Sequence, residues 1–432
     1  MPTGRLVTVV GAVGVLCLLA PAPLVFALVA DVVLLVAALV DVVLAPDPSG
    51  VSVEREAPAI IGLGREGTVT WRVTNPSPRA VSVLVADELA PSLRAGRRRF
   101  SLRVPRLGTA VASTVLRPTR RGRFTPSEID VRVAGPLGLA ARQRRRLVPG
   151  QIRVYPPFRS REEAELRVDR ARILEVGLRS AKGRGSGTDF EQLREWTPDD
   201  ETRRIDWSAT ARAGKPILRT YRAERNQTVL VLLDNGRVQA GQVEGAPRVE
   251  HATDAVLLLT YLATRLGDRC GLIAYDRTVR AVVPPSHRAT QLGRVTEALF
   301  DLEPSLVESD HRAAFTEALV RFRRRALFVI LTDLSSTSVA EVLIPAMPLL
   351  LRRHVVLIGS VRDPEVDGWA ASTPNDASAV YRKAAAVAAL DARAAVAARL
   401  RGLGAVVVDE VPGRIAPALG DAYLDIKARG RL

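Results

Sequence analysis

The sequence is poor in cysteine, histidine and aromatic residues, which build disulfide frameworks, metal clusters and base-stacking surfaces. It has two cysteines and four histidines in 432 residues, and aromatic residues make up 4% of the chain. Cys17 lies in an apolar run and Cys270 opens an expected strand, so we predict neither a disulfide nor a thiolate metal site. The shortage of aromatic side chains disfavours nucleic-acid binding by base stacking.

Positive charge and aliphatic side chains, by contrast, are in excess. The formal net charge is +16, and hydrophobic residues make up 47% of the chain. A basic surplus favours anionic partners, which include nucleic acid, acidic protein surfaces and the anionic lipids of a membrane. The arginines are spread along the chain and do not gather on one element, which disfavours a dedicated nucleic-acid site. Anionic lipid stays open as a partner.

An almost uninterrupted apolar run opens the chain and is broken at Pro21-Ala22-Pro23. Its two halves, 6–20 and 24–44, compare with the about 20 residues that a helix needs to cross a bilayer. We therefore predict a transmembrane helical hairpin over residues 1–46. The alternative is a secretory signal peptide, but a proline follows each plausible cleavage position, Ala20 and Ala22.

The charges around this hairpin predict its orientation. Arg5 flanks one end, Arg55 and Arg65 flank the other, and the turn carries no charge. The positive-inside rule then places both ends in the cytoplasm, as in a multi-pass protein of the cell membrane. Two acidic residues fall in the second helix. Asp41 can reach the interface near the helix end, whereas Asp31 either contacts a partner helix or is tolerated at a shallow position by local water.

Residues 47–150 alternate apolar and polar residues with a period of two over several short stretches. Clear examples are 67–73, 81–85 and 129–133, separated by Gly/Pro turns. This pattern predicts a β-sandwich domain. Arginine runs at 97–99 and 144–146 would keep strand edges from aggregating, and they are close enough to the hairpin to touch anionic headgroups.

A charged connecting region at 151–226 leads to a segment, 227–432, that alternates strands and helices. Such alternation predicts an α/β domain with a doubly wound sheet. The expected strands are 228–233, 271–275, an antiparallel edge at 278–283, 327–331, 354–359 and 405–408. The expected helices are 248–266, 289–302, 313–324, 339–352, 377–402 and 415–428.

Two aspartates, Asp234 and Asp333, follow apolar strands of this sheet. Ligands of open α/β sheets bind beyond the carboxyl ends of the strands, where carboxylates can hold a hard cation such as Mg²⁺. The arrangement resembles the von Willebrand factor A fold, in which Asp-x-Ser-x-Ser with a later Thr and Asp forms a metal-ion-dependent adhesion site. Here Gly236 and Val238 replace the two serines, and Arg237 adds a positive charge, so we expect a degenerate site.

The third oxygen donor of such a site is not evident, although Asp310 or Thr316 would be candidates. Two readings stay open, weak divalent-metal binding or two aspartates that cap the following loops and helices. The histidines match no metalloprotease or catalytic-triad pattern, so we predict neither a cofactor nor enzymatic turnover.

The densest cluster of charged and aromatic residues lies between 187 and 212. Interspersed arginine, carboxylate and tryptophan side chains predict interlocked ion pairs and cation–π contacts. By composition alone, an ordinary solvated turn and helix would fit as well. The candidate interaction residues are Arg194, Glu195, Trp196, Asp200, Arg204, Asp206, Trp207 and Arg212.

The order of these residues resembles the signature of the domain-of-unknown-function 58 (DUF58) family. The matching positions are Leu193-Arg194-Glu195-Trp196, Pro198, Asp200, Arg204-Ile205-Asp206-Trp207 and Ala211-Arg212, with Asp199 in place of the family's glycine. The membrane hairpin, the β domain and the A-like domain follow in family order. The loop 135–139, which reads Gly-Pro-Leu-Gly-Leu, stands where the family carries Asp-Pro-Phe-Gly-Leu.

The resemblance implies an adaptor or chaperone-like partner of a MoxR-type AAA ATPase. We therefore expect a membrane-anchored interaction protein that assists the assembly or remodelling of protein complexes. The alternatives are binding of anionic lipid or nucleic acid through the basic surface, or a divalent-metal-dependent binding domain.

Overall fold

The computed structural model describes residues 3–17, 23–181, 189–197, 202, 205–222, 227–334 and 337–430. The chain divides into two compact units, Met1–Tyr155 and Pro156–Leu432. Each unit has its own hydrophobic core, and we describe them in turn.

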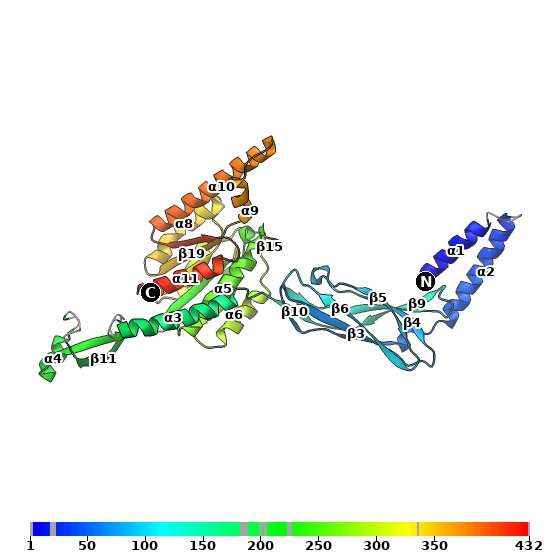
Figure 1. Ribbon diagram of the computed structural model, residues 1–432, viewed down its shortest axis with the longest axis horizontal. Helices are drawn as coiled ribbons and strands as arrows, with labels where there is room; N and C mark the ends of the chain where they lie inside the picture. The colour runs from blue at the N-terminus through cyan, green and yellow to red at the C-terminus, as the bar shows by residue number, and fades with distance from the viewer. Residues whose placement is uncertain are drawn as a thin grey trace. The chain divides into compact units, whose positions relative to one another are not determined.

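Two apolar helices open the first unit, and they lie side by side in Figure 1. They are α1 (Gly4–Cys17) and α2 (Pro23–Leu44). Among the described residues, α2 is the helix that is long and apolar enough to cross a membrane, and 6% of its most apolar stretch is buried. This exposure of an apolar helix favours membrane anchoring. The two-span topology and its orientation stay predictions, because α1 is the shorter apolar helix.

The end of α2 is fastened to the β-strands of the same unit by a buried carboxylate. Asp41 is 0% exposed and accepts hydrogen bonds from the backbone N–H groups of Leu137 (2.7 Å), Leu139 (2.7 Å) and Ala140 (2.8 Å). Thr3, just before α1, donates its N–H to the Leu139 carbonyl at 3.0 Å. The ends of both helices therefore hold the loop 135–140. Asp31 is exposed on α2.

The remainder of the first unit consists of strands, as the period-two pattern predicted. They form sheets with the orders β1-β3-β6, β2-β10-β7 and β5-β4-β8-β9. Their bounds are β1 (Ser52–Glu56), β2 (Ile60–Gly62), β3 (Gly67–Asn75), β4 (Val81–Asp87), β5 (Arg99–Val104), β6 (Gly108–Leu116), β7 (Gly122–Phe124), β8 (Glu128–Ala134), β9 (Ala141–Leu147) and β10 (Ile152–Tyr155).

Alternate side chains of these strands point into one core, in which Trp71 and Val131 are fully buried. Within it, Asp87 accepts hydrogen bonds from Trp71 Nε1 at 2.6 Å and from Arg55 Nη1 at 2.7 Å. The Arg55 side chain is 1% exposed. The prediction that Arg55 flanks the membrane helices was therefore wrong. Strand alternation turns its side chain inward, where the buried carboxylate of Asp87 neutralises it.

The predicted connecting region, 151–226, is divided between the two units. β10 pairs with β2 and β7 and completes a sheet of the first unit. Helix α3 (Arg161–Ala181) belongs to the second unit, because Ala164 and Val168 pack into its core. The unit boundary consequently lies after Tyr155, a few residues beyond the predicted one at 150.

The second unit is built on a sheet with the order β17-β16-β13-β18-β19-β20. β16 and β17 pair antiparallel, and the other neighbours pair in parallel, as the sequence predicted. The bounds are β13 (Thr228–Asp234), β14 (Gln242–Val243), β15 (Ala246–Pro247), β16 (Arg269–Tyr275), β17 (Val279–Ser286), β18 (Leu327–Leu331), β19 (Val355–Val361) and β20 (Val406–Glu410).

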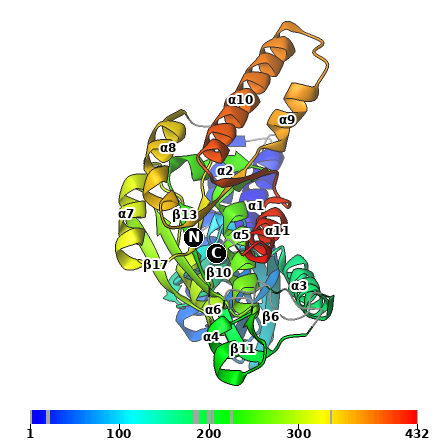
Figure 2. The ribbon, with the colours of Figure 1, turned by 90° about the vertical axis from the view of Figure 1, so that its left-hand side faces the viewer.

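Helices cover both faces of this sheet, so the side chains of β13 alternate between two cores. Val231 faces the core shared with α3, α5, α6 and α11, and Leu232 faces the core shared with α7, α8 and α10. The bounds are α5 (Arg248–Arg265), α6 (Gln291–Phe300), α7 (His311–Arg321), α8 (Thr337–Leu351), α10 (Ala377–Gly402) and α11 (Ile415–Ala428). A short helix that the sequence analysis missed, α9 (Pro364–Ala371), packs beside α10 (Figure 2).

Candidate functional site

The two predicted metal-site aspartates lie at the carboxyl ends of neighbouring strands, where the sequence placed them. Asp234 is the last residue of β13, and Asp333 follows β18 by two residues. Their exposed fractions are 0% and 1%. Buried carboxylates of this kind require partners, because an unpaired buried charge is strongly unfavourable.

Both carboxylate oxygens of Asp234 are engaged by hydroxyl groups. Ser309 Oγ donates to Oδ1 at 2.5 Å, and Thr332 Oγ1 donates to Oδ2 at 2.6 Å. The N–H of Gly236 also donates to Oδ1, at 2.9 Å. Sequence reasoning missed Ser309 and Thr332. Thr332 could have been found from its position directly before Asp333. No local pattern indicates Ser309, because it lies 75 residues from Asp234.

Asp333 is paired with a buried arginine. Arg393 of α10 is 5% exposed, and its Nη1 donates to Asp333 Oδ1 at 2.6 Å. The same guanidinium donates to Asp409 Oδ2 from Nε at 2.9 Å and to Ser360 Oγ from Nη2 at 2.6 Å. Arg248 Nη1 lies 3.6 Å from the other oxygen of Asp333. Arg393 thus ties together the carboxyl ends of β18, β19 and β20.

The charge of Arg393 is stable in this setting. Burial by itself lowers the pKa of Arg393, but the hydrogen bond to Asp409 and the charges of Asp333 and Asp409 outweigh it, so the pKa is raised. The guanidinium stays protonated at every physiological pH. It supplies the positive charge that a metal ion would otherwise bring to Asp333.

The residues around these aspartates do not fit the metal-ion-dependent adhesion site. A Cβ atom at Gly236 would lie 2.1 Å from Ser309 Oγ and 2.8 Å from the Val307 carbonyl oxygen, so a serine there has no space. Arg237 forms an ion pair with Glu308. Within the described ranges, no group of three or more His, Cys, Asp or Glu side chains could hold a metal ion.

Neither suggested replacement for the missing threonine contacts Asp234. Asp310 caps helix α7 by accepting the Ala313 N–H at 2.9 Å, and Thr316 donates its hydroxyl to the Arg312 carbonyl at 2.8 Å. Both suggestions were wrong. The structural reason is that Asp310 lies at the first turn of α7 and Thr316 on its exposed surface, whereas Ser309 reaches Asp234 from the preceding loop.

Tyr275 and His311 form a buried polar pair near Asp234. The tyrosine hydroxyl lies 2.8 Å from His311 Nδ1. Burial raises the pKa of Tyr275 well above its usual range. Burial also lowers the pKa of His311, although the charge of Asp234 opposes the shift. Both groups are therefore neutral at pH 7, and the pair serves as a hydrogen-bonded contact of the core.

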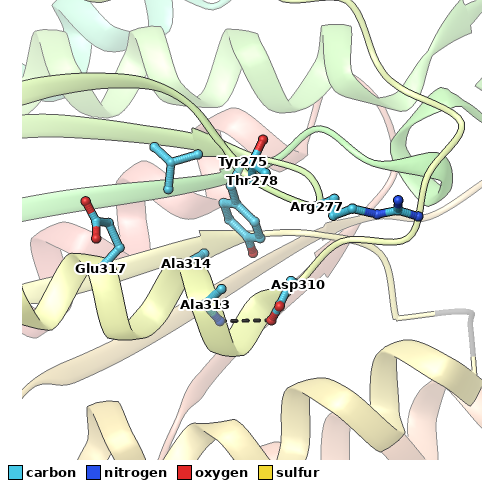
Figure 3. Close-up of a pocket in the computed structure, with 8 residues that line it drawn as sticks. Tyr275, Arg277, Thr278, Asp310, Ala313, Ala314 and Glu317 are labelled. Carbon is cyan, nitrogen blue, oxygen red and sulfur yellow. Dashed lines mark hydrogen bonds between the residues drawn. The ribbon is translucent and has the colours of Figure 1, made fainter.

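A shallow pocket of about 270 Å³ opens beside this pair (Figure 3). Its wall combines Arg277 and Glu317 with small residues of α7. It shares Asp310 with the predicted site, and Asp234 and Asp333 do not line it. The lining residues are Tyr275, Arg277, Thr278, Val279, Asp310, Ala313, Ala314 and Glu317.

The predicted interaction residues lie on a different part of the second unit, which we term the signature arm. It consists of β11 (Asp189–Glu195), the short helix α4 (Trp207–Ala213) and β12 (Ile217–Arg222), with β11 and β12 antiparallel. Asp206 begins α4 by accepting the N–H groups of Ser208 (3.0 Å) and Ala209 (3.1 Å). The Asp206 N–H donates to the Ile217 carbonyl at 2.8 Å, which binds the helix to the hairpin.

The charged side chains of the arm engage in local contacts. Glu195 forms an ion pair with Lys215. Arg194 Nη1 donates to the Glu195 carbonyl at 3.0 Å, and Arg212 Nε donates to the Ser208 carbonyl at 3.2 Å.

The two tryptophans of the arm differ, because Trp196 takes part in a backbone hydrogen bond of the hairpin and Trp207 is exposed. The Trp196 N–H donates to the Pro216 carbonyl at 2.9 Å. Trp207 is 71% exposed on α4. Asp200 and Arg204 lie outside the described residues, so the interlocked pairs predicted for them stay a prediction. The signature is thus carried by a folded hairpin, separate from the two aspartates of the sheet.

Comparison with known proteins identifies this part of the chain. Residues 192–369 match the family model described as "Protein of unknown function DUF58". Uncharacterized proteins of Mycobacterium tuberculosis and Mycobacterium bovis are 27% identical over 153 residues, which is 34% of this chain and 48% of those relatives. The match therefore spans about half the length of the curated relatives.

Among solved structures, the CARDB domain of a Pyrococcus furiosus protein is 15% identical over 24% of this chain and 94% of that chain, with a TM-score of 0.18. WR4, a C. elegans member of the MSP family, is 13% identical over 24% of this chain and 97% of that chain, with a TM-score of 0.17. Likeness at this level says nothing about what this chain binds. The family match begins at Gln192 in the signature arm and ends at Trp369 in α9, and it supports the resemblance to the DUF58 family that the signature predicted.

Proposed function

We propose that this chain is a membrane-anchored interaction protein that works with a MoxR-type AAA ATPase in the assembly or remodelling of protein complexes. The observation that carries the proposal is the signature arm, which presents Trp207 at 71% exposure from a helix fixed by Asp206. Large aromatic side chains presented by ordered elements are typical anchors of protein interfaces. The proposal extends the family resemblance of the arm to a function.

The second unit resembles a von Willebrand factor A-like domain with a degenerate adhesion site, and in our proposal it binds without a metal ion. Its sheet order and single antiparallel edge pair support the fold. The pairing of Asp333 with Arg393 supports the loss of the cation. Since the carboxylates of this region are held by internal donors, we assign them to the architecture and expect no turnover.

The anchoring part of the proposal places α1 and α2 in the cell membrane and the other domains in the cytoplasm. The apolar exposure of α2 supports the anchor. Arg5 in the first turn of α1 and the exposed residues Arg142 and Arg144 near the end of α2 support the orientation, because positive residues at the ends of spans favour the cytoplasmic side. In the proposed topology, the charges that flank α2 are therefore Arg142 and Arg144, and the buried Arg55 is not one of them.

The test is affinity purification of the full chain from its native membranes, comparing wild type with Trp207→Ala. We expect wild type to recover an AAA ATPase and Trp207→Ala to lose most of it, since a central interface tryptophan contributes about 2 kcal/mol or more. Tyr381→Ala is the matched control, because Tyr381 is an aromatic residue 77% exposed on α10. Wild type that never recovers an AAA ATPase, or equal losses in both variants, would contradict the proposal.

A further inference from the structure

The point where the apolar helices meet the strands of the first unit is fixed by hydrogen bonds. Asp41, in the last turn of α2, accepts three backbone N–H groups from the loop 135–140. Thr3 Oγ1, at the start of α1, donates to the Gly138 carbonyl at 2.5 Å. The loop therefore lies level with the ends of both apolar helices. If these helices enter a membrane, the loop lies at its surface.

The loop 135–140 carries an exposed apolar side chain, Leu137, and the Arg5 side chain of α1 lies beside this loop. Leu137 is 53% exposed, and Leu44, in the last turn of α2, is 52% exposed. The guanidinium of Arg5 lies over the loop, since a Cβ atom at Gly138 would be 3.0 Å from Arg5 Nη1. An exposed apolar residue next to a guanidinium is the usual composition of a membrane–water interface.

Strand β9 carries two exposed arginines, Arg142 and Arg144, near the end of α2. Figure 1 shows β9 beside the end of α2. Side chains alternate along a strand, so Arg142, Arg144 and Arg146 share one face. Arg146 Nη2 donates to the Pro48 carbonyl at 2.9 Å, and Arg142 Nη1 lies 3.5 Å from the Ala45 carbonyl oxygen. This face is therefore turned toward the segment 45–49, where the chain leaves α2.

Two carboxylates lie among these arginines without cancelling them. Asp41 is buried, and its oxygens already accept three backbone N–H groups of the loop. Asp47 accepts the Ser49 N–H at 3.0 Å, which lowers the pKa of Asp47, and the charges of Arg142 and Arg144 lower it further. Asp41 and Asp47 are outnumbered by four arginines, which are Arg5, Arg142, Arg144 and Arg146. Arg142 and Arg144 are exposed, so their guanidinium groups can reach a ligand.

We propose that a rim formed by Arg5, Leu137, Arg142 and Arg144 binds the headgroup phosphate of an anionic phospholipid. Guanidinium groups match phosphate oxygens in pairs, and basic residues beside a membrane helix attract anionic lipid. The rim continues the apolar surface of α2, which selects a lipid over a soluble phosphate. This inference rests on the proposed membrane anchoring and adds the lipid class that the anchor prefers.

The experiment is native mass spectrometry of the full chain in detergent with equal amounts of phosphatidylglycerol and phosphatidylcholine. We expect wild type to retain phosphatidylglycerol preferentially. The double variant Arg142→Gln/Arg144→Gln should lower that preference about tenfold, because two arginines near the surface are lost. The matched control is Arg99→Gln/Arg103→Gln, which removes two exposed arginines from β5, the opposite edge strand of the same sheet.

The lipid proposal is overturned if wild type shows no preference, if Arg142→Gln/Arg144→Gln keeps it, or if the β5 control loses as much. A carbonate wash of native membranes separates the two levels of the argument. Wild type that washes off overturns the anchoring and the lipid site together. Wild type that stays in the membrane but has no preference for phosphatidylglycerol overturns only the lipid site.

Discussion

The buried charges at the carboxyl ends of the strands and the charges of the signature arm are used in opposite ways. We call the first group, Asp234, Asp333 and Arg393, the closed crevice. In the crevice, Asp333 and Arg393 are 1% and 5% exposed, and each satisfies the other. In the arm, Glu195 and Lys215 form an exposed pair, and Trp207 is directed to solvent. The comparison teaches that the predicted ligand site of this sheet consists of internally paired charges, whereas the arm exposes the tryptophan that we propose as a partner contact.

Removing the buried guanidinium should have the largest effect on stability among changes to the charged residues of these two regions. Arg393→Ala leaves the buried Asp333 with only the more distant Arg248 and leaves the partly buried Asp409 without its cation, which costs about 3–5 kcal/mol. Arg393→Lys should lose less, because it keeps the charge but cannot donate to three partners in one plane. Urea unfolding of the full chain in detergent measures both. A loss below about 1 kcal/mol for Arg393→Ala would mean that the ion pairs of Arg393 stabilise the fold no more than exposed surface pairs do.

Restoring a serine in the first loop tests whether the crevice can still become a metal site. Gly236→Ser would place Cβ 2.1 Å from Ser309 Oγ, and such overpacking costs about 1–3 kcal/mol. Gly293→Ser is the matched control, because a Cβ atom there meets nothing within 4 Å. Thermal unfolding with and without millimolar Mg²⁺ provides the measurement. A variant stabilised by Mg²⁺ would mean that the site lacked only its hydroxyl.

The crevice also shows what the sequence could and could not predict. Strand–helix alternation predicted β13 and β18, and thereby placed Asp234 and Asp333 at one edge of the sheet. It could not predict Arg393, which comes from an alanine-rich helix 60 residues from Asp333. The available signal was its spacing from Ala386, Ala397 and Leu400, which marks the buried face of α10.

The first unit gives the same lesson. Period-two alternation predicts its strands, but the local charge pattern wrongly predicts that Arg55 flanks the membrane helices. Arg55 instead pairs with Asp87, 32 residues away, because the fold brings a strand end opposite a buried carboxylate. Long-range pairs of this kind depend on tertiary packing, which a local pattern does not contain. The signature arm was located from its motif, and its hairpin was not predicted.

Acid should weaken the sheet and leave the arm intact. His354, at the start of β19, is 5% exposed, and neither ring nitrogen has a hydrogen-bond partner. Burial lowers the pKa of His354, and the charges of Arg353 and Arg325 lower it further. A lowered pKa means that the unfolded chain binds the proton more readily. Its contribution to stability is therefore complete above about pH 6.5 and is lost as the pH falls through the lowered value.

His354→Phe should consequently reduce the loss of unfolding free energy below pH 6.5, since a phenyl ring fits against Phe328 and does not titrate. Urea unfolding at pH 7.5 and pH 5 measures the change. His287→Phe, at an exposed position, is the control. The arm from 189 to 222 contains no histidine, so partner binding should survive mild acid. Identical pH dependence of wild type and His354→Phe would mean that His354 does not contribute to the loss of stability in acid.

The smallest effect on stability is expected in the arm. Trp207→Ala should change the free energy of unfolding by no more than about 0.5 kcal/mol, because most of the side chain is already in water. Trp71→Ala is the contrasting variant, since Trp71 is 0% exposed and bonded to Asp87, and its loss should cost about 3–5 kcal/mol. Urea unfolding ranks the two. If Trp207→Ala destabilised the chain as much as Trp71→Ala, the tryptophan would be a packing residue, and the contrast between a closed crevice and an open arm would fail.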